Sequence, residues 1–309
     1  MYEIVIDSTC GLPKDLRLKY GLYEDYLHGI IYLPKGEYAA DLEFEEYSQK
    51  EYFSIIKKNA GKIKTAFSSY DEFSRVIEPI LKEGKDVILP VISTGLSGTY
   101  NGFIQFAKII LEDYPNRKIE VINTLKYGPA AGLLCIYAGI NKINGMSFED
   151  NVNWLNKKRY ELHQIGVLDD LSFLAKSGRL SATKAFFGQL VGIQAIADFT
   201  YDGKTTPLGT VKGSKSANSL SLKYLKQTIV KPEEQIIFVC HSNRYERAKI
   251  FAKQLRSEIV AKDVVIISVD ESCGPNIGPG LCAYFYFGVP LSKDREPETN
   301  LFNKLKESI

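Results

Sequence analysis

Apolar and polar residues alternate with two different periods along the first half of the chain. Short apolar runs predict buried strands, among them EIVIDS (3–8), DVILPVIS (86–93) and KIEVINT (118–124). Segments with apolar residues three and four positions apart predict helices, for example SYDEFSRVIEPILKEG (69–84) and YNGFIQFAKIILEDY (100–114). Strands that alternate with helices indicate an α/β fold whose sheet has substantial parallel pairing.

The second half of the chain predicts a further set of strands and helices. Residues 196–212 carry an Asp-Gly pair between two extended runs, which is typical of a β-hairpin. Strand-like runs follow at 235–242, 263–272 and 281–289, and the helical pattern NRYERAKIFAKQLRSEIV separates the first two. This half is therefore also expected to be α/β.

Length and charge narrow the class of protein. Because 309 residues exceed what one core usually supports, we expect two α/β domains, residues 1–155 and 156–309. The formal net charge of +2 predicts no broad basic surface for nucleic acid. No apolar stretch is long enough to span a bilayer, and MYEIVIDST enters a strand without the pattern of a signal peptide. We therefore expect a cytoplasmic protein that does not bind nucleic acid.

Cysteine and histidine are too few and too scattered to predict a metal centre. The five cysteines form no CxxC pair, and their odd number argues against a disulfide framework. Three of them lie in apolar runs and are expected in the core, whereas Cys10 and Cys273 lie in loops that could expose them. With only three histidines and no grouped acidic ligands, we expect neither a metal nor a cofactor.

Four loops are rich in hydroxyl residues, glycine or both: DSTCGLP (7–13), TAFSS (65–69), STGLSGTY (93–100) and NIGPG (276–280). Ligands of open α/β sheets lie beyond the carboxyl ends of the strands, so the first three loops should share one edge. The third loop begins a helix, whose N–H groups and dipole favour an anion. We expect a carboxylate or phosphate there, with Asp7 as a turn or capping residue. The alternative is that Ser97 or Thr99 only caps the helix.

The segment AFFGQLVGIQAIADF (185–199) is more apolar than one amphipathic face requires. It is either a buried helix that runs into a buried strand, or the lining of an elongated apolar cavity. The residues that would line such a cavity are Phe186, Phe187, Leu190, Val191, Ile193 and Ile196. A cavity of this kind beside an anion-binding loop would suit a fatty acid.

No familiar catalytic spacing occurs in the chain. Ser97 lacks the second glycine of a GxSxG elbow, because Thr99 stands there, and the chain contains no GxxxxGK[ST] loop. His241 follows a predicted strand and could in principle serve Ser97 as a base, which leaves an acyl hydrolase as a rival hypothesis. A surface or capping histidine is the competing interpretation of His241.

Taken in order, several short motifs resemble those of the DegV family, the fatty-acid-binding component of the bacterial fatty acid kinase. The motifs are IVIDSTCGLP, ISTGLSGTYN, VINTLKYGPAAGLL, DDLSFLAKSGRLS, YDGKTTPLGTVKGSKSA and NIGPG. They cover nearly the whole chain. Several weak motifs in the family's order are more specific than any one of them alone.

The resemblance implies two α/β domains with a lipid tunnel between them. It implies that Thr65 and Ser97, with the backbone around Gly98, hold the carboxylate of a long-chain fatty acid. A separate kinase related to dihydroxyacetone kinases would then supply ATP and form an acyl phosphate for phospholipid synthesis. On this view the chain is a binding subunit rather than an enzyme, and its carrier role allows transient contact with a membrane surface.

The chain departs from the family pattern at several positions. The family's Thr-Ser-Gln-Pro-Ser loop is TAFSS here, and its Gly-Gly-Arg is SGR, with Arg179 retained to face a phosphate or a partner. A structural ion pair is the alternative role for Arg179. Asn276 stands where the family has a histidine associated with phosphorylation, and an amide cannot shuttle a proton near neutral pH. Gln194 and Ala195 replace a frequent Lys-Pro. A lipid carrier that is uncoupled from the kinase is therefore an alternative.

Overall fold

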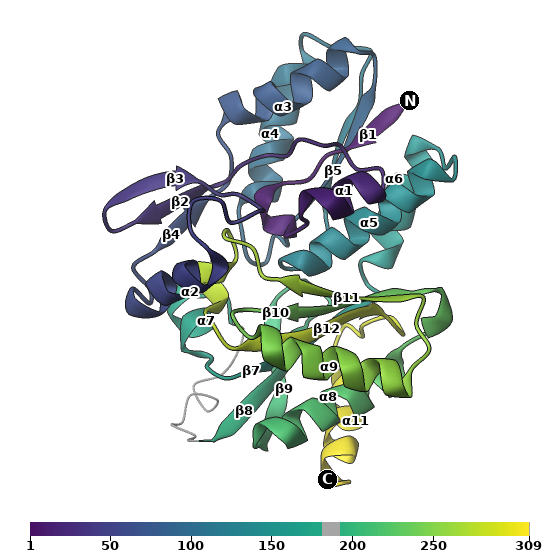
Figure 1. The fold of residues 1–309 in the computed structure, drawn as a ribbon. Helices are drawn as coiled ribbons and strands as arrows, with labels where there is room; N and C mark the ends of the chain where they lie inside the picture. Colours follow the sequence, from purple (N-terminus) through teal and green to yellow (C-terminus); the bar gives the residue numbers. More distant parts are fainter. Residues whose placement is uncertain (181–191, 309) are drawn as a thin grey trace. The chain divides into compact units, whose positions relative to one another are not determined.

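The computed structural model describes residues 1–180 and 192–308, and the chain separates into two compact units (Figure 1). Unit 1 comprises Met1–Ser48, Lys62–Arg159 and Asp270–Cys273. Unit 2 comprises Gln49–Gly61, Tyr160–Val269 and Gly274–Ile309. Each unit combines a sheet with helices, so the structure confirms the predicted α/β class with two units. Within the described residues, no helix is both long and apolar enough to cross a membrane.

Unit 1 is built on a parallel sheet in the order β1-β5-β6, made of β1 (Tyr2–Ile4), β5 (Asp86–Val91) and β6 (Ile119–Asn123). The parallel pairing confirms the prediction from the alternation of strands and helices. Pro90 is tolerated in the central strand because β1 pairs only as far as Ile88, so Pro90 lies beyond the stretch of β5 that has neighbours on both sides.

The helices of unit 1 are α1 (Lys14–Lys19), α3 (Tyr70–Lys82), α4 (Thr99–Leu111), α5 (Pro129–Ile143) and α6 (Phe148–Lys158), with a short 3-10 turn η1 (Ser8–Cys10). Helices α3 and α4 bury their apolar stripes with β5 in one hydrophobic core. Ser69 and Ser147 cap α3 and α6, and each accepts a backbone N–H from three residues ahead.

A glycine lets α5 approach the start of the chain closely. A methyl group on Gly132 would lie 2.3 Å from the carbonyl oxygen of Cys10, so no larger residue fits between α5 and η1. A second, antiparallel sheet of unit 1 has the order β3-β2-β4, from β2 (Ile30–Leu33), β3 (Gly36–Ala39) and β4 (Lys64–Ala66).

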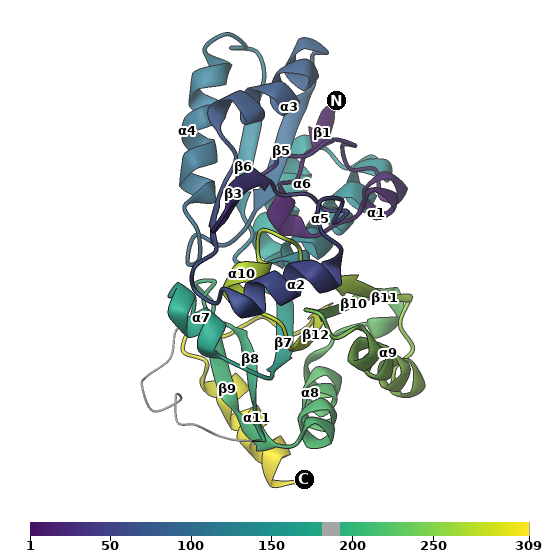
Figure 2. The same cartoon turned by 60° about the vertical axis from the view of Figure 1, so that its left-hand side comes forward.

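Unit 2 contains a sheet in the order β11-β10-β12-β7-β8-β9 (Figure 2). Its strands are β7 (Leu162–Leu168), β8 (Ile193–Phe199), β9 (Thr205–Lys212), β10 (Ile236–His241), β11 (Asp263–Ser268) and β12 (Leu281–Phe287). Only the β10–β11 pair is parallel. The predicted hairpin is confirmed, because Asp202 and Gly203 lie in the turn between β8 and β9.

The described helices of unit 2 are α2 (Gln49–Lys58), α7 (Ser172–Ser177), α8 (Ser214–Thr228), α9 (Tyr245–Glu258), α10 (Gly274–Ile277) and α11 (Glu296–Glu307), with a 3-10 turn η3 (Pro232–Glu234). Residues of α8, α9 and α11 pack with the sheet in one hydrophobic core.

A buried ion pair joins two strands inside this sheet. His163 Nδ1 lies 3.0 Å from Asp198 Oδ2, and His163 Nε2 lies 2.8 Å from the carbonyl oxygen of Val289. Burial would raise the pKa of Asp198, but the hydrogen bond and charge of His163 outweigh it and hold that pKa below its usual range.

Breaking this pair should destabilise unit 2 strongly. We predict that Asp198→Ala lowers the free energy of unfolding by about 3–5 kcal/mol, because it leaves His163 buried without its carboxylate. Asp202→Ala, in the exposed turn four residues later, should cost about 1 kcal/mol or less. Urea unfolding followed by circular dichroism measures both variants, and equal losses would contradict the prediction.

Candidate functional site

The loop before α4 places hydroxyl groups at the start of a helix in unit 1. Ser97 Oγ accepts the Thr99 N–H at 3.3 Å and lies 2.8 Å from Thr99 Oγ1. Gly98 is the N-cap of α4, and nothing lies within 4 Å of the position that a β-carbon would occupy there. The first turn of α4 is therefore reached through an open, exposed glycine, with the positive end of the helix dipole behind it.

Thr65 lies on β4 of the same unit, and packing links its loop to α4. Thr65 pairs with Ile31 of β2 and is half-buried. Two residues later, the ring of Phe67 packs on α4, with its centroid 5.7 Å from that of Phe103. A methyl group on Gly102 would lie 2.5 Å from this ring, so the absence of a side chain at Gly102 leaves room for Phe67. The loop that follows Thr65 thus packs on α4, the helix that begins two residues after Ser97.

The loop after β1 folds as predicted for Asp7. Asp7 caps η1 by accepting the Thr9 N–H at 3.1 Å and the Thr9 hydroxyl at 2.5 Å. Burial raises the pKa of Asp7 to about 6, against the lowering effect of those hydrogen bonds. Asp7 is only 3% exposed, so its carboxylate does not confront an anion at the surface.

In unit 2 the structure brings Arg179 and Asn276 into neighbouring loops. Helix α7 ends at Gly178, whose φ of 73° favours glycine, and the Arg179 guanidinium donates to the Ser177 carbonyl. The Ser177 hydroxyl reaches the Asn276 carbonyl oxygen at 3.5 Å. A β-carbon on Gly278 would lie 2.3 Å from the Phe173 ring of α7, so the two loops pack tightly.

Comparison with known proteins identifies the family. The model of the DegV family, described as uncharacterised, matches residues 1–289. The chain belongs to the DegV family. A DegV domain-containing protein from Clostridium perfringens is 28% identical over 287 residues, which cover 93% of this chain and 97% of the relative.

Solved DegV structures share this fold. A DegV family protein from Thermus thermophilus, described by its fatty acid binding, aligns with a TM-score of 0.81 at 23% identity, over 93% of this chain and 99% of that one. A stearic acid-binding protein from Eubacterium ventriosum aligns with a TM-score of 0.81 at 21% identity, over 93% and 98% of the two chains.

The apolar residues proposed to line a cavity in this DegV chain are only partly described. Phe186, Phe187, Leu190 and Val191 lie outside the described residues. Ile193 is half-buried on β8, and Ile196 is fully buried in the hydrophobic core of unit 2. Their role toward a lipid stays a prediction.

The cysteines that loops could have exposed are buried. Cys10 lies on η1 with its sulfur 4.0 Å from that of Cys135, and Cys273 is 1% exposed. Contact with the Cys135 thiol and burial raise the pKa of Cys10, and burial raises the pKa of Cys273. The expectation of exposure is wrong because both loops pack inside unit 1, and neither thiol is activated as a nucleophile.

The rival hydrolase hypothesis finds no support in the surroundings of His241. Burial lowers the pKa of His241 to about 4, so the imidazole is a weak base at neutral pH. Its Nδ1 faces the Arg244 N–H at 3.5 Å, and the Ser97 hydroxyl contacts Thr99. Across residues 1–180 and 192–308, no group of three His, Cys, Asp or Glu side chains could hold a metal ion.

The pairing of Phe67 with Gly102 was not predicted from the sequence. Its only signals are an aromatic residue inside a hydroxyl-rich loop and a glycine near the start of an apolar helix. Neither signal says that the two residues meet.

We predict that Gly102→Ala destabilises unit 1 by about 1–2 kcal/mol, because the added methyl displaces the Phe67 ring from α4. In the double variant Phe67→Ala/Gly102→Ala, this cost should fall to a few tenths of a kcal/mol relative to Phe67→Ala alone. Gly98→Ala is the matched control, since nothing lies near its β-carbon position. Additive losses in urea unfolding would refute the coupling.

Proposed function

We propose that this chain binds one long-chain fatty acid without covalent chemistry and holds its carboxylate with Thr65, Ser97 and the backbone at Gly98. The observation that carries the proposal is the open start of α4, where a hydroxyl, helix N–H groups and the helix dipole meet. The Thermus thermophilus and Eubacterium ventriosum proteins, which have the same fold, are described as fatty-acid-binding.

The hydrogen bonds around Ser97 leave its hydroxyl proton available for donation to a carboxylate. The Thr99 N–H donates to Ser97 Oγ, and the Thr99 hydroxyl can donate to the same oxygen. When both do so, the Ser97 proton is left to point away from the helix toward a ligand. A hydroxyl bond to a charged carboxylate is short and stronger than a neutral one.

We further propose that catalysis belongs to a separate kinase related to dihydroxyacetone kinases, which phosphorylates the bound fatty acid for phospholipid synthesis. The adjacent loops of Arg179 and Asn276 in unit 2 would face that partner or the phosphate. Asn276 also supports a second candidate, a carrier uncoupled from the kinase, because its amide can hydrogen-bond but cannot carry a proton.

Removing the Ser97 hydroxyl should weaken fatty-acid binding. We expect Ser97→Ala to raise the Kd by roughly 10- to 150-fold, equivalent to about 1.5–3 kcal/mol for a lost bond to a charged group. Thr94→Ala, which removes a hydroxyl from the same loop, should leave the Kd unchanged. Native mass spectrometry with stearate and displacement titration measure both.

The outcomes of that experiment distinguish an error in the assigned anchor residue from an error in the assigned ligand. Equal affinity of the wild type and Ser97→Ala would refute the anchor but keep the fatty-acid ligand. A wild type that stays at its bare sequence mass after incubation with fatty acids would refute the ligand itself.

Restoring the family histidine tests the coupling to a kinase. With a fatty acid kinase, ATP and bound stearate, coupling to the kinase predicts acyl phosphate from the wild type, whereas an uncoupled carrier predicts little from the wild type and at least tenfold more from Asn276→His. The physical reason is that an imidazole near neutral pH can bind and release a proton. Chromatography of the acyl phosphate, trapped as its hydroxamate, measures the product. Substantial and equal formation by both proteins would show that Asn276 supports coupling, and stearate affinity serves as the control for folding.

A further inference from the structure

A short segment of the second half of the chain docks into unit 1. Asp270–Cys273 belongs to unit 1, whereas Val269 before it and Gly274 after it belong to unit 2. The segment follows β11 and leads directly into α10, which carries Asn276. Any event that loosens these four residues therefore acts on the anchor of the loop that contains Asn276.

Hydrogen bonds fix the segment at three points in unit 1. The Ser272 hydroxyl lies 2.8 Å from that of Ser8, in the loop after β1. The Tyr127 hydroxyl donates to the Cys273 carbonyl at 2.6 Å, and Glu271 Oε2 accepts the Asp41 N–H at 3.0 Å. These contacts tie the segment to loops that follow β1, β3 and β6.

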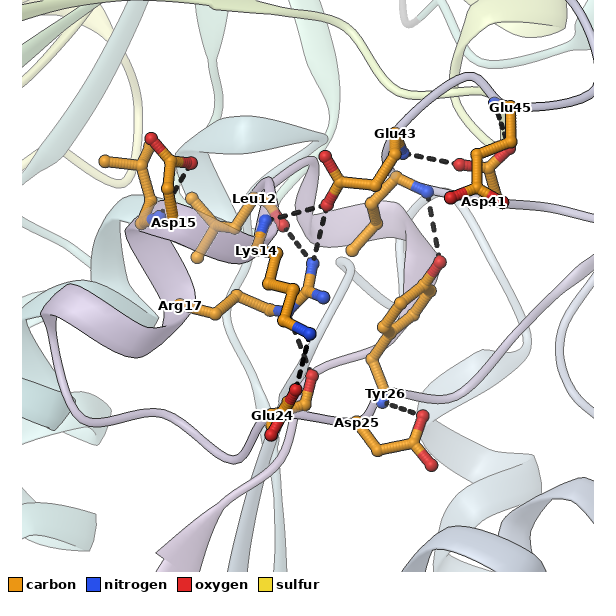
Figure 3. Close-up of polar contacts among 12 residues, drawn as sticks. Leu12, Lys14, Asp15, Arg17, Glu24, Asp25, Tyr26, Asp41, Glu43 and Glu45 are labelled. Atoms are coloured by element: carbon orange, nitrogen blue, oxygen red, sulfur yellow. Dashed lines mark hydrogen bonds and ion pairs between the residues drawn. The ribbon is translucent and has the colours of Figure 1, made fainter.

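The part of unit 1 that receives Glu271 is itself held by a polar network (Figure 3). Asp41 accepts the backbone N–H groups of Glu43 and Glu45 at 2.5 and 2.8 Å. The buried Arg17 guanidinium donates to the Leu12 carbonyl at 2.7 Å and lies 3.4 Å from Glu43. Hydrogen bonds therefore hold the backbone around Asp41, the group that donates to Glu271.

Asp270 occupies a position where an ionised carboxylate is costly. Its side chain is 1% exposed, and Oδ1 accepts the Cys273 N–H at 2.7 Å. Oδ2 is buried and has no hydrogen-bond partner among the described residues. Methyl groups on Gly11 and Gly128 would come within 3.4 and 3.6 Å of this oxygen, so glycine backbones surround it. A neutral carboxyl is far cheaper to bury here than a charged one.

The groups that face Asp270 and Glu271 reinforce this preference. Burial raises the pKa of Asp270 to about 8, the neighbouring Asp7 charge adds to it, and hydrogen bonds from Cys273 oppose it. Burial raises the pKa of Glu271 to about 7, supported by the charges of Asp41 and Glu46. Hydrogen bonds from the Asp41 N–H and the Tyr38 hydroxyl oppose that rise. The groups that cause these two shifts are carboxylates, a thiol, a phenol and backbone N–H groups.

We propose that Asp270–Cys273 is a proton-controlled latch, which docks on unit 1 while Asp270 and Glu271 carry protons and releases when they ionise. The latch does not depend on the proposed fatty-acid binding. On release, Ser8 loses the Ser272 hydroxyl and Tyr127 loses its carbonyl acceptor, so the loops after β1 and β6 lose a fixed neighbour. The chain leading into α10 loses its anchor in the same step.

The direction of the pH dependence follows from the two protonation equilibria. The docked segment binds more protons than the released one, in which the carboxyls return to their ordinary pKa values of 3.8 and 4.5. Docking is therefore most stable at low pH and weakens as the pH rises through the window up to about 7 and 8. Within that window, each group makes release roughly tenfold more favourable per pH unit.

Hydrogen–deuterium exchange of the full-length protein between pH 5 and pH 9 measures this release. The amides of Cys273 and Asp41 are direct reporters, because they donate to Asp270 and Glu271. After correction for intrinsic exchange, we expect their protection to fall at least 100-fold between pH 5 and 7 and to level off above about pH 8. Peptides from β10, in the other unit, should keep constant protection.

Variants that cannot ionise decide the question. Asp270→Asn/Glu271→Gln should show no pH dependence of protection at Asp41 and Cys273, and Glu271→Gln alone should show a shallower one. Glu233→Gln/Glu234→Gln, a neighbouring exposed pair in η3, should behave as the wild type. Protection that is independent of pH in the wild type, or an unchanged slope in the double variant or in Glu271→Gln, would overturn the latch.

Discussion

The parallel pairing of β1, β5 and β6 decides where unit 1 can do chemistry. Because the three strands run the same way, the loops that follow them emerge at one edge of the sheet. Backbone bonds join two of these loops, since the Ser93 N–H donates to the Lys126 carbonyl. The latch segment bonds to the loop after β1 through Ser8 and to the loop after β6 through Tyr127. The hydroxyl-rich start of α4 and the docked segment therefore depend on one strand arrangement.

Burial shields two acidic groups at this edge of the sheet, Asp7 and Asp270, from the surface. The carboxylate of Asp7 caps η1 and accepts the hydroxyl and the backbone N–H of Thr9. The β-carbon positions of Gly11 and Gly128 lie 3.4 and 3.6 Å from Asp270 Oδ2. Both carboxyls have raised pKa values because burial disfavours their charge. The hydroxyl of Ser97 at the start of α4 is a neutral donor, as the proposed carboxylate site requires.

Local sequence pattern predicted the features that are themselves local. Strand and helix periodicity indicated the parallel sheet of unit 1, and Asp202–Gly203 indicated the β8–β9 hairpin. Hydroxyl and glycine content marked the loop around Ser97. The choice of Thr65 within TAFSS came from the family resemblance, because composition does not distinguish it from Ser68 or Ser69.

The features that escaped prediction depend on contacts between distant residues. The hairpin of β2 and β3 has mixed polarity and gives a weak strand signal. The packing of Phe67 against Gly102 and the burial of Cys10 and Cys273 can be recognised only once the fold is known. So does the membership of Asp270–Cys273 in unit 1, since no local pattern tells a tetrapeptide which core it joins.

The replacement of the family histidine by Asn276 and the acidity of the latch have a physical connection. Asn276 cannot change its charge near neutral pH, and the NIGPG loop contains no titratable side chain. Asp270 and Glu271, which lie six and five positions earlier, have pKa values of about 8 and 7 and do titrate in that range. In the proposed latch they act on the anchor of the loop and not on a ligand. Sensitivity to protons in this DegV protein would therefore govern how firmly the loop is held, while the amide of Asn276 transfers no proton.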